Sequence, residues 1–326
     1  MSVTRLTKVP NLKRIVLELL KQIPEGKVTT YKDLAVALGD AGAARAVGTI
    51  MANNSSPEKY PCWRVVYSDG RVGKYSGSGG RKGKIEKIRK AGIPVEDGKI
   101  KDFSSFRFQE FQLDSPLDDL RRIQGEISKM VSEGKEQAVS QAAGVDVSYG
   151  SEGVVASYVE MCQSDEEVLR EKTLAKNEVK FPYVPGYLAF RELPFLVELL
   201  EGVRDESGLA DLIFVDGNGL LHPRKAGLAS HLGVVLDQPT VGVAKKLLCG
   251  SVDESGMELG RQREIKADGE NMGLAVQTYE RANPIYVSVG HKVTLRQAGK
   301  LAKQYSRYKL PEPLRLAHKL AKGKAT

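Results

Sequence analysis

The sequence predicts an α/β protein with two domains, a mainly helical domain with a helix-turn-helix and, after it, a mixed α/β domain. The first hundred residues contain helical patterns separated by glycine turns. The rest of the chain alternates helical patterns with short apolar runs typical of buried strands. A chain of 326 residues is also long enough for two hydrophobic cores. We expect the domains at residues 1–100 and 105–326, with a polar linker at 93–105.

Three helices are predicted in the first domain. Apolar side chains recur at helical spacing from Asn11 to Lys21, where Ile-Pro-Glu-Gly follows. Thr30 is placed to cap a second helix over 31–38, with Asp33 three positions later in a capping box. A third helix over 43–53 follows a glycine turn and is rich in small residues. A helix, a short turn and a small-faced helix indicate a helix-turn-helix, although small residues also favour close packing of two helices.

The second domain is predicted to alternate helices and strands. Helices are expected at 117–134, from 188 with an interruption or bend near Pro194, and at 226–232; strands are expected at 142–149, 154–161, 211–216 and 240–244. Asp146 and Asp216 lie on two of these apolar strands. A carboxylate among apolar neighbours is costly unless it is paired or bound to a metal. Two or three converging carboxylates suit Mg²⁺, whereas a single one is more often a strand-end or capping residue.

The charge of the chain is unevenly distributed. Residues 1–101 carry 20 Lys and Arg against 9 Asp and Glu, residues 102–291 carry 19 against 31, and residues 292–326 carry 10 against 1. Basic ends suit a phosphate backbone, so nucleic acid is the expected partner. The acidic middle suits cation binding by a few carboxylates and a solvated surface for most of them.

Cysteine usage and hydropathy exclude several classes of protein. Cys62, Cys162 and Cys249 are too far apart and too few for a disulfide framework or a C-x-x-C zinc site. No apolar run approaches transmembrane length, and the first residues lack the apolar segment of a signal peptide. We therefore expect a cytoplasmic protein that does not use a membrane, and no obligate protein partner is evident.

The segment 181–192 combines a rigid turn with a positioned acid. Two prolines and a glycine hold the backbone, Tyr183 lies within the turn, and Glu192 is the acid of the helix that follows. A rigid aromatic ring beside a positioned carboxylate suits an enzyme that opens a base stack next to a metal.

Motifs in the first domain identify a family resemblance. They are Ile-Pro-x-Gly-x-Val-x-Thr-Tyr at 23–31, Arg-Ala-Val-Gly at 45–48, Asn54, Pro-Cys-x-Arg-Val at 61–65 and Gly-x-Tyr-Ser-Gly at 73–77. In order and spacing, residues 12–92 resemble the active, DNA-binding domain of the alkylguanine-DNA alkyltransferases. The resemblance implies that Cys62 takes the alkyl group from O-6-alkylguanine on a base flipped out of the duplex. It also implies supporting functions: Arg45 fills the space left by the base, Tyr31 crowds the phosphate, Asn54 orders the active-site turn, and Tyr75 and Ser76 line the pocket.

Two residues depart from the alkyltransferase pattern. Trp63 stands where the family has a histidine after the cysteine, and Ala91 stands where it has the glutamate that orients this histidine. Indole has no basic nitrogen, which leaves helix dipoles and Arg64 to favour the reactive thiolate. Two interpretations therefore stay open, alkyl transfer to Cys62 and a domain that binds lesions without reacting and tethers the nuclease.

Motifs in the second domain resemble endonuclease V over roughly residues 105–310. They are Val-Asp-Val-Ser-Tyr at 145–149, Pro-Tyr-Val-Pro-Gly at 182–186 with Phe-Arg-Glu at 190–192, Val-Asp-Gly-Asn-Gly at 215–219 with His-Pro-Arg at 222–224, and Gly-Val-Ala-Lys at 242–245. The resemblance implies a ribonuclease-H-like fold and cutting of DNA 3′ to deaminated bases such as hypoxanthine, with Mg²⁺, or Mn²⁺, as the cofactor. Double- and single-stranded DNA with alkylated or deaminated bases are the implied partners, and inosine-containing RNA is an alternative substrate of the nuclease.

The same resemblance assigns functions to individual residues. It implies that Asp146, Glu192 and Asp216 form the metal site, that Tyr183 fills the space beside the lesion, that Gly186 borders the base pocket, and that Lys245 and His291 stand near the scissile phosphate. His222 is expected to brace the loop after Asp216, because Pro223 fixes it in a turn. No function is predicted for His231 or His318.

Overall fold

The computed structural model describes residues 3–164 and 167–325. Within them the chain forms two compact units. One, called the helical unit, comprises Val9–Leu120 and Lys180–Pro185. The other, called the sheet unit, comprises the described residues of Met1–Lys8, Arg121–Val179 and Gly186–Thr326. The domain boundaries expected from the sequence, 1–100 and 105–326, stay a prediction.

The helical unit contains the three predicted helices. They are α2 (Leu12–Leu19), extended by a 3₁₀ turn η1 (Leu20–Gln22), α3 (Tyr31–Ala37) and α4 (Ala44–Ala52), which a 3₁₀ turn η2 (Ala41–Ala43) precedes. The capping box at the start of α3 is confirmed, since Thr30 and Asp33 each accept a hydrogen bond from the other's backbone N–H. A two-residue parallel pair, β1 (Thr29–Thr30) with β2 (Val65–Val66), joins the start of α3 to the segment after Cys62. Cys62 itself begins a 3₁₀ turn, η3 (Cys62–Arg64), and α5 (Gly80–Lys90) follows.

Residues 93–105 are not a linker, and that prediction was wrong. They form a hairpin, β3 (Val95–Glu96) with β4 (Lys99–Ile100), and the short helix α6 (Phe103–Phe106) follows. Val95 and Ile100 are buried in one apolar cluster with Ile88 of α5. The segment has a polar composition because charged residues alternate with a few apolar ones. The apolar side chains nevertheless point to the same side and pack into the core of the helical unit.

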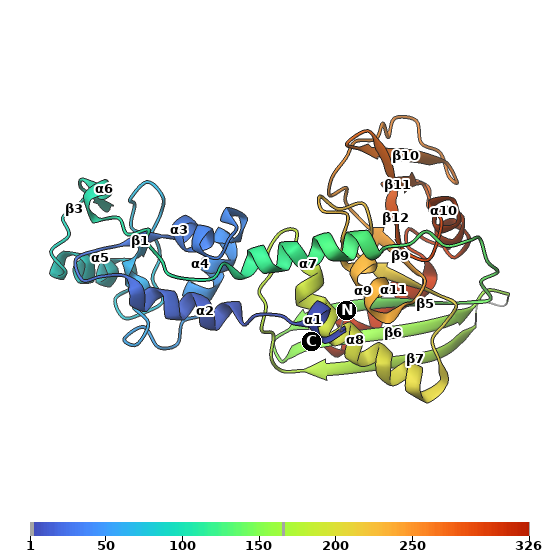
Figure 1. Ribbon diagram of the computed structural model, residues 1–326, viewed down its shortest axis with the longest axis horizontal. Coiled ribbons are helices and arrows are strands. Elements are labelled where there is room, and N and C mark those ends of the chain that lie inside the picture. Colours follow the sequence, from blue (N-terminus) through green and yellow to red (C-terminus); the bar gives the residue numbers. More distant parts are fainter. Residues whose placement is uncertain (1–2, 165–166, 326) are drawn as a thin grey trace. The chain divides into compact units, whose positions relative to one another are not determined.

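The sheet unit is built on one eight-stranded mixed sheet, in the order β10-β11-β12-β9-β8-β5-β6-β7 (Figure 1). The strands are β5 (Gln141–Gly150), β6 (Gly153–Cys162), β7 (Val168–Lys176), β8 (Leu212–Asp216), β9 (Thr240–Ala244), β10 (Gln262–Ala267), β11 (Glu270–Val276) and β12 (Ile285–His291). The pairs β5–β8 and β8–β9 are parallel, and the remaining pairs are antiparallel. The four predicted strands are confirmed as β5, β6, β8 and β9.

The strands of this sheet contact helices α8 (Leu188–Ser207), α9 (Leu228–Leu236), α10 (Leu295–Gln304) and α11 (Glu312–Lys324). Helix α7 (Pro116–Met130) begins in the helical unit and ends in the sheet unit. Side chains of α10 and α11 share an apolar cluster with Phe214 and the strands around it, while α8 and α9 pack together as a second layer. The helix α8 continues through Pro194, so the predicted interruption is absent. No helix in the described part of the chain has the length and apolarity needed to cross a membrane.

The packing of α11 on β5 is unusually close. A Cβ at Gly144 would lie 2.3 Å from the backbone nitrogen of Leu314, and one at Gly150 would overlap the carbonyl of Ala325. Glycine therefore lets the helix contact the strand backbone directly. Farther along the same helix, the carbonyl of Ala317 accepts a 2.8 Å hydrogen bond from the buried Ser157 hydroxyl of β6.

The short helix α1 (Val3–Thr7) belongs to the sheet unit, although the helical unit follows it in the chain. Its Leu6 is buried, and the Leu6 carbonyl accepts a 3.0 Å hydrogen bond from Nε2 of the fully buried His231 in α9. The segment 9–120 is thus an insertion between two parts of the sheet unit.

Candidate functional sites

Two acidic side chains and a histidine meet above the centre of the sheet. Parallel pairing of Val145 with Val215 places the next residues, Asp146 on β5 and Asp216 at the end of β8, side by side. His318 on α11 donates a 2.8 Å hydrogen bond from Nδ1 to Oδ2 of Asp146. The ligand atoms of Asp146, Asp216 and His318 lie within 4.8 Å of one another, close enough to hold one metal ion.

Glu192 lies in the electrostatic field of the same group. Its carboxyl is buried on α8, and burial, together with the charges of Asp146 and Asp216, raises its pKa well above the usual value. Burial and Asp216 also raise the pKa of Asp146, against the opposing effect of His318. Carboxylates crowded in a buried place favour protonation unless a cation neutralises them. Carboxylate oxygens together with one imidazole fit a divalent metal ion. These side chains therefore suit the Mg²⁺ or Mn²⁺ that the resemblance to endonuclease V implies.

Lys245 is brought to this group, and His291 is not. Lys245 follows β9 and donates a 2.6 Å hydrogen bond from Nζ to Oδ2 of Asp216. His291 pairs with Thr240 at the other end of β9, three register positions from the neighbour of Asp216. At about 3.3 Å per residue this is roughly 10 Å along the strands. Nδ1 of His291 accepts a hydrogen bond from the backbone of Ser132, and burial lowers its pKa.

The carbonyl of Gly186 is held by three donors. Gln124 Nε2 donates at 2.9 Å, an Arg224 guanidinium nitrogen at 2.5 Å and His222 Nε2 at 3.2 Å. Nδ1 of His222 accepts from the backbone N–H of Arg224, so the ring is neutral with its proton on Nε2. Burial lowers the pKa of His222 to about 4, which keeps this tautomer at neutral pH. His222 thus fixes the Gly186 turn, and a Cβ on Gly186, whose φ is +79°, would meet Arg224 at 2.7 Å.

Tyr183 is presented to solvent by a buried turn. Phe181 and Val184 on either side of it are 2% and 1% exposed, whereas Tyr183 is 56% exposed. Anchored neighbours hold the backbone while the ring points outward, which is the arrangement that stacking on a base requires.

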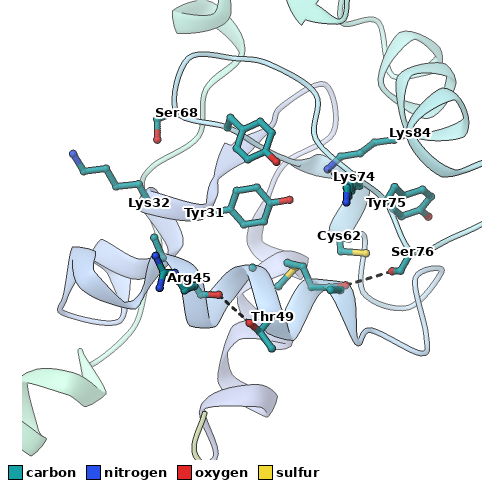
Figure 2. Close-up of a pocket in the computed structure, with 15 residues that line it drawn as sticks. Tyr31, Lys32, Arg45, Thr49, Cys62, Ser68, Lys74, Tyr75, Ser76 and Lys84 are labelled. Carbon is teal, nitrogen blue, oxygen red and sulfur yellow. Dashed lines mark hydrogen bonds between the residues drawn. The ribbon is translucent and has the colours of Figure 1, made fainter. Parts of the chain in front are cut away.

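Cys62 lies on the wall of a cavity of about 820 Å³ in the helical unit (Figure 2). Its side chain is 3% exposed. Several predicted residues line the same cavity: Tyr31 at the start of α3, Arg45 on α4, and Tyr75 and Ser76 in the loop before α5. Burial, with smaller effects of Tyr67 and Cys62, raises the pKa of Tyr31 to about 12, so its hydroxyl is a proton donor at neutral pH.

Asn54 and Arg64 support the segment that carries Cys62 without lining the cavity. Nδ2 of Asn54 donates to the carbonyl of Tyr60 at 2.9 Å, and its Oδ1 accepts from the backbone of Ser56 at 3.0 Å. The guanidinium of Arg64 donates to the carbonyls of Ile23 and Pro24. Its charge is therefore directed at these carbonyls, whereas the sequence led us to expect it to act on the thiol.

Two residues of these sites were not found by sequence reasoning. His318 lies 172 positions after Asp146, outside every motif. The signal available was its place beside the buried stripe Leu314, Ala317 and Ala321 of an amphipathic helix. Lys84 lines the Cys62 cavity although it is a lysine in a basic helix. Its helical spacing of four from the buried Ile88 was the available signal.

Comparisons with known proteins match two parts of the chain to two different families. Residues 124–319 match the family model of endonuclease V, and residues 11–91 match that of the 6-O-methylguanine DNA methyltransferase DNA-binding domain. The bifunctional methyltransferase/endonuclease of Picrophilus torridus is 37% identical over 300 residues, 92% of either chain. That of Thermoplasma volcanium is 35% identical over 304 residues, 93% of this chain and 87% of the relative.

Solved structures of endonuclease V are similar to the sheet unit. The catalytic domain of human endonuclease V is 33% identical with a TM-score of 0.61, covering 65% of this chain and 97% of that one. Ciona intestinalis endonuclease V, solved with a 24mer DNA containing an inosine followed by a ribo-adenosine, is 26% identical with a TM-score of 0.58, covering 65% and 98%. These likenesses confirm the predicted ribonuclease-H-like fold. The endonuclease V family is a family of metal-dependent nucleases. The chain belongs to the bifunctional methyltransferase/endonuclease family of DNA repair proteins, in which an alkyltransferase DNA-binding domain is joined to an endonuclease V domain.

Proposed function

We propose that this protein repairs two kinds of altered purine in DNA. Cys62 accepts the alkyl group of O-6-alkylguanine, and the sheet unit cuts the strand 3′ to deaminated bases, chiefly hypoxanthine. The observation that carries the nuclease half is the convergence of Asp146, Asp216 and His318 within 4.8 Å in a chain of the endonuclease V family. The observation that carries the transfer half is the thiol of Cys62 on the wall of a cavity large enough for a flipped base.

In the nuclease centre, Asp146, Glu192, Asp216 and His318 would hold Mg²⁺, with Mn²⁺ as the alternative ion. The ion supplies Lewis acidity toward the phosphate and a hydroxide nucleophile. The carboxylates provide the hard oxygen ligands that these ions prefer. Lys245, 2.6 Å from Asp216, holds a positive charge at the edge of the group, where it can bind a phosphate oxygen.

Recognition of the lesion is assigned to the turn that precedes α8. The exposed ring of Tyr183 stacks in the space beside the flipped base, and the clamped Gly186 borders the pocket for that base. The inosine in the DNA bound to the Ciona enzyme supports hypoxanthine as the target. The ribo-adenosine in the same strand keeps RNA as a second candidate, so both kinds of strand belong in the test.

The nuclease assignment is tested by cutting assays on matched strands. Wild-type protein, Glu192→Gln and the exposed control Glu201→Gln on the same helix are compared on hypoxanthine-containing DNA and inosine-containing RNA. We expect cutting that requires added Mg²⁺, that Glu192→Gln loses and that Glu201→Gln retains. Undiminished cutting in excess EDTA would refute the metal site, and faster cutting of RNA than of DNA would replace the proposed substrate.

The transfer assignment is tested by intact mass. Incubation with a duplex containing O-6-methylguanine should add one methyl group to the chain, which peptide mapping places on Cys62. An unchanged mass with the duplex still bound would favour the alternative of a lesion-binding domain that does not react. A methyl group on Cys162 or Cys249 would show that the motif has been wrongly matched.

A further inference from the structure

The residues next to Cys62 in the chain do not supply a proton acceptor for its thiol. Trp63 has no basic nitrogen, and its ring packs beside the apolar cluster of Val28 and Val66. The guanidinium of Arg64 is bound to the carbonyls of Ile23 and Pro24. Ala91 has no polar side chain. A thiol that reacts in this cavity needs a partner from elsewhere, because the thiolate is the nucleophilic form.

Lys84 is the buried titratable group that reaches this cavity from α5. It is 1% exposed and lines the same cavity as Cys62. Figure 2 shows its side chain extending from the helix toward the space between Cys62 and the ring of Tyr31. Nζ donates to the carbonyl of Val65 at 2.6 Å and, at 3.5 Å, to that of Lys74. Among the described residues these carbonyls are its hydrogen-bond partners, and no carboxylate forms an ion pair with it. Burying an ammonium group without a counter-ion is costly, which indicates a function for the charge.

We propose that Lys84 is the proton-transfer partner of Cys62, taking the place of the histidine and glutamate that Trp63 and Ala91 replace. The inference rests on the proposed transfer of an alkyl group to Cys62. The Lys84 amine accepts the proton of the thiol, giving a thiolate beside an ammonium. The sulfur then attacks the alkyl carbon, a C–S bond forms, and the C–O6 bond breaks with its electron pair left on the guanine. The ammonium returns the proton to the guanine, so that one proton passes from the thiol to the base.

The electrostatics of the cavity agree with this assignment. Burial lowers the pKa of Lys84 to about 8, against an opposing effect of the Cys62 charge. Both forms of the amine are therefore populated near neutral pH, as a group that accepts and returns a proton requires. The other titratable or charged groups lining the cavity are Tyr31 and Lys32 of α3, Arg45 of α4, Tyr67 after β2, and Lys74 and Tyr75 before α5. Tyr31 and Tyr75 hold their protons, since burial raises the pKa of both.

The test uses the full chain and two reactions of Cys62. One is methyl transfer from O-6-methylguanine duplex, and the other is carboxamidomethylation of Cys62 by iodoacetamide, each followed by mass mapping from pH 6 to 10. Lys84→Met removes the amine, Lys84→Arg keeps a charge that does not release a proton in this range, and Lys82→Met is the matched control from the exposed side of the same helix. Thermal unfolding shows whether each variant is folded.

We expect Lys84→Met to slow the iodoacetamide reaction at pH 7 by about tenfold or more, since a nearby positive charge favours the thiolate. Lys84→Arg should keep the iodoacetamide rate and lose about 10²-fold in methyl transfer. The wild-type transfer rate should rise and then fall with pH, whereas that of Lys84→Met should only rise. Lys82→Met should match the wild type.

Two results would overturn the inference, and a third would separate it from the proposed function. Folded Lys84→Met with the wild-type iodoacetamide profile would show that Lys84 does not pair with the thiol. Lys84→Arg with the wild-type transfer rate and pH profile would exclude proton transfer, and this result holds even if Lys84→Met fails to fold. If wild-type protein transfers no methyl group, the proposed function fails, while equal iodoacetamide rates in wild type and Lys84→Arg, both faster than Lys84→Met, would still establish the pairing.

Discussion

Replacing Gly144 by alanine tests whether the position of α11 controls the nuclease centre. The new Cβ would lie 2.3 Å from backbone atoms of Leu314 and Pro313, whereas ordinary contact begins at 3.4 Å. Because protein interiors are close-packed, helix and strand must separate by about 1 Å. His318 lies one turn beyond Leu314, and its 2.8 Å bond to Asp146 would lengthen past the limit of a hydrogen bond. We expect a loss of about 1–3 kcal/mol of stability from overpacking and about 10²-fold slower cutting from misplacement of His318.

The assay is single-turnover cutting of a hypoxanthine duplex at saturating Mg²⁺, together with thermal unfolding. Gly202→Ala is the matched control, because its Cβ would meet no atom within 4 Å on α8. It should cut at the wild-type rate and unfold at an equal or higher temperature. Methyl transfer by Cys62 should be unchanged in both variants. If Gly144→Ala cuts and unfolds like the wild type, close contact with β5 does not position α11, and the reasoning is wrong.

Three further outcomes follow from the same geometry. His318→Ala should reduce cutting and raise the Mg²⁺ concentration needed for half-maximal rate, with methyl transfer unchanged; a normal Mg²⁺ dependence would remove His318 from the centre. Tyr183→Ala should weaken binding to a hypoxanthine duplex by about 1–3 kcal/mol, and binding to the corresponding single strand by less, as anisotropy titrations can measure; equal losses would make Tyr183 a turn residue. Burial lowers the pKa of His231 from 6.5 to about 4. The stability that the neutral His231 side chain contributes to the fold is therefore present above pH 6.5 and lost as the pH falls toward 4. In urea unfolding, the free energy of unfolding of His231→Gln should change with pH by about 3 kcal/mol less than that of the wild type over this range. Equal pH dependence in the two proteins would contradict the prediction.

The local sequence pattern was sufficient to predict elements in which the order of apolar and polar residues follows the burial of their side chains. The apolar run at 240–244 predicted β9 with the bounds that the structure has, and Asp146 and Asp216 stood out because a charged residue interrupts an apolar strand. The strands β7, β10, β11 and β12 were not predicted. In β7 and β10, for example, most side chains are exposed or only partly buried, so alternation is weak.

The sequence did not predict which separate elements contact one another in the fold. His318 meets Asp146 because α11 packs on β5 at Gly144, a contact between residues 170 positions apart. The register of β12, which places His291 opposite Thr240, likewise depends on strand order in the sheet. In the segment 93–105, burial of Val95 and Ile100 against α5 outweighed a composition typical of a linker. In the first two cases the deciding contact joins residues distant in the chain, and in the third it joins a hairpin to the helix before it; helical or strand periodicity predicts neither kind of contact.

The position of α11 after every described strand of the sheet has a consequence during synthesis of the chain. The residues of the helical unit that surround Cys62 emerge early and are contiguous, so they can fold while the sheet is still being made. The cluster of Asp146, Asp216 and His318 cannot form until His318 has left the ribosome, and Leu6 cannot make its contact with His231 until a segment 225 positions later has been synthesised. A nascent chain could therefore bind damaged DNA before it is able to cut it.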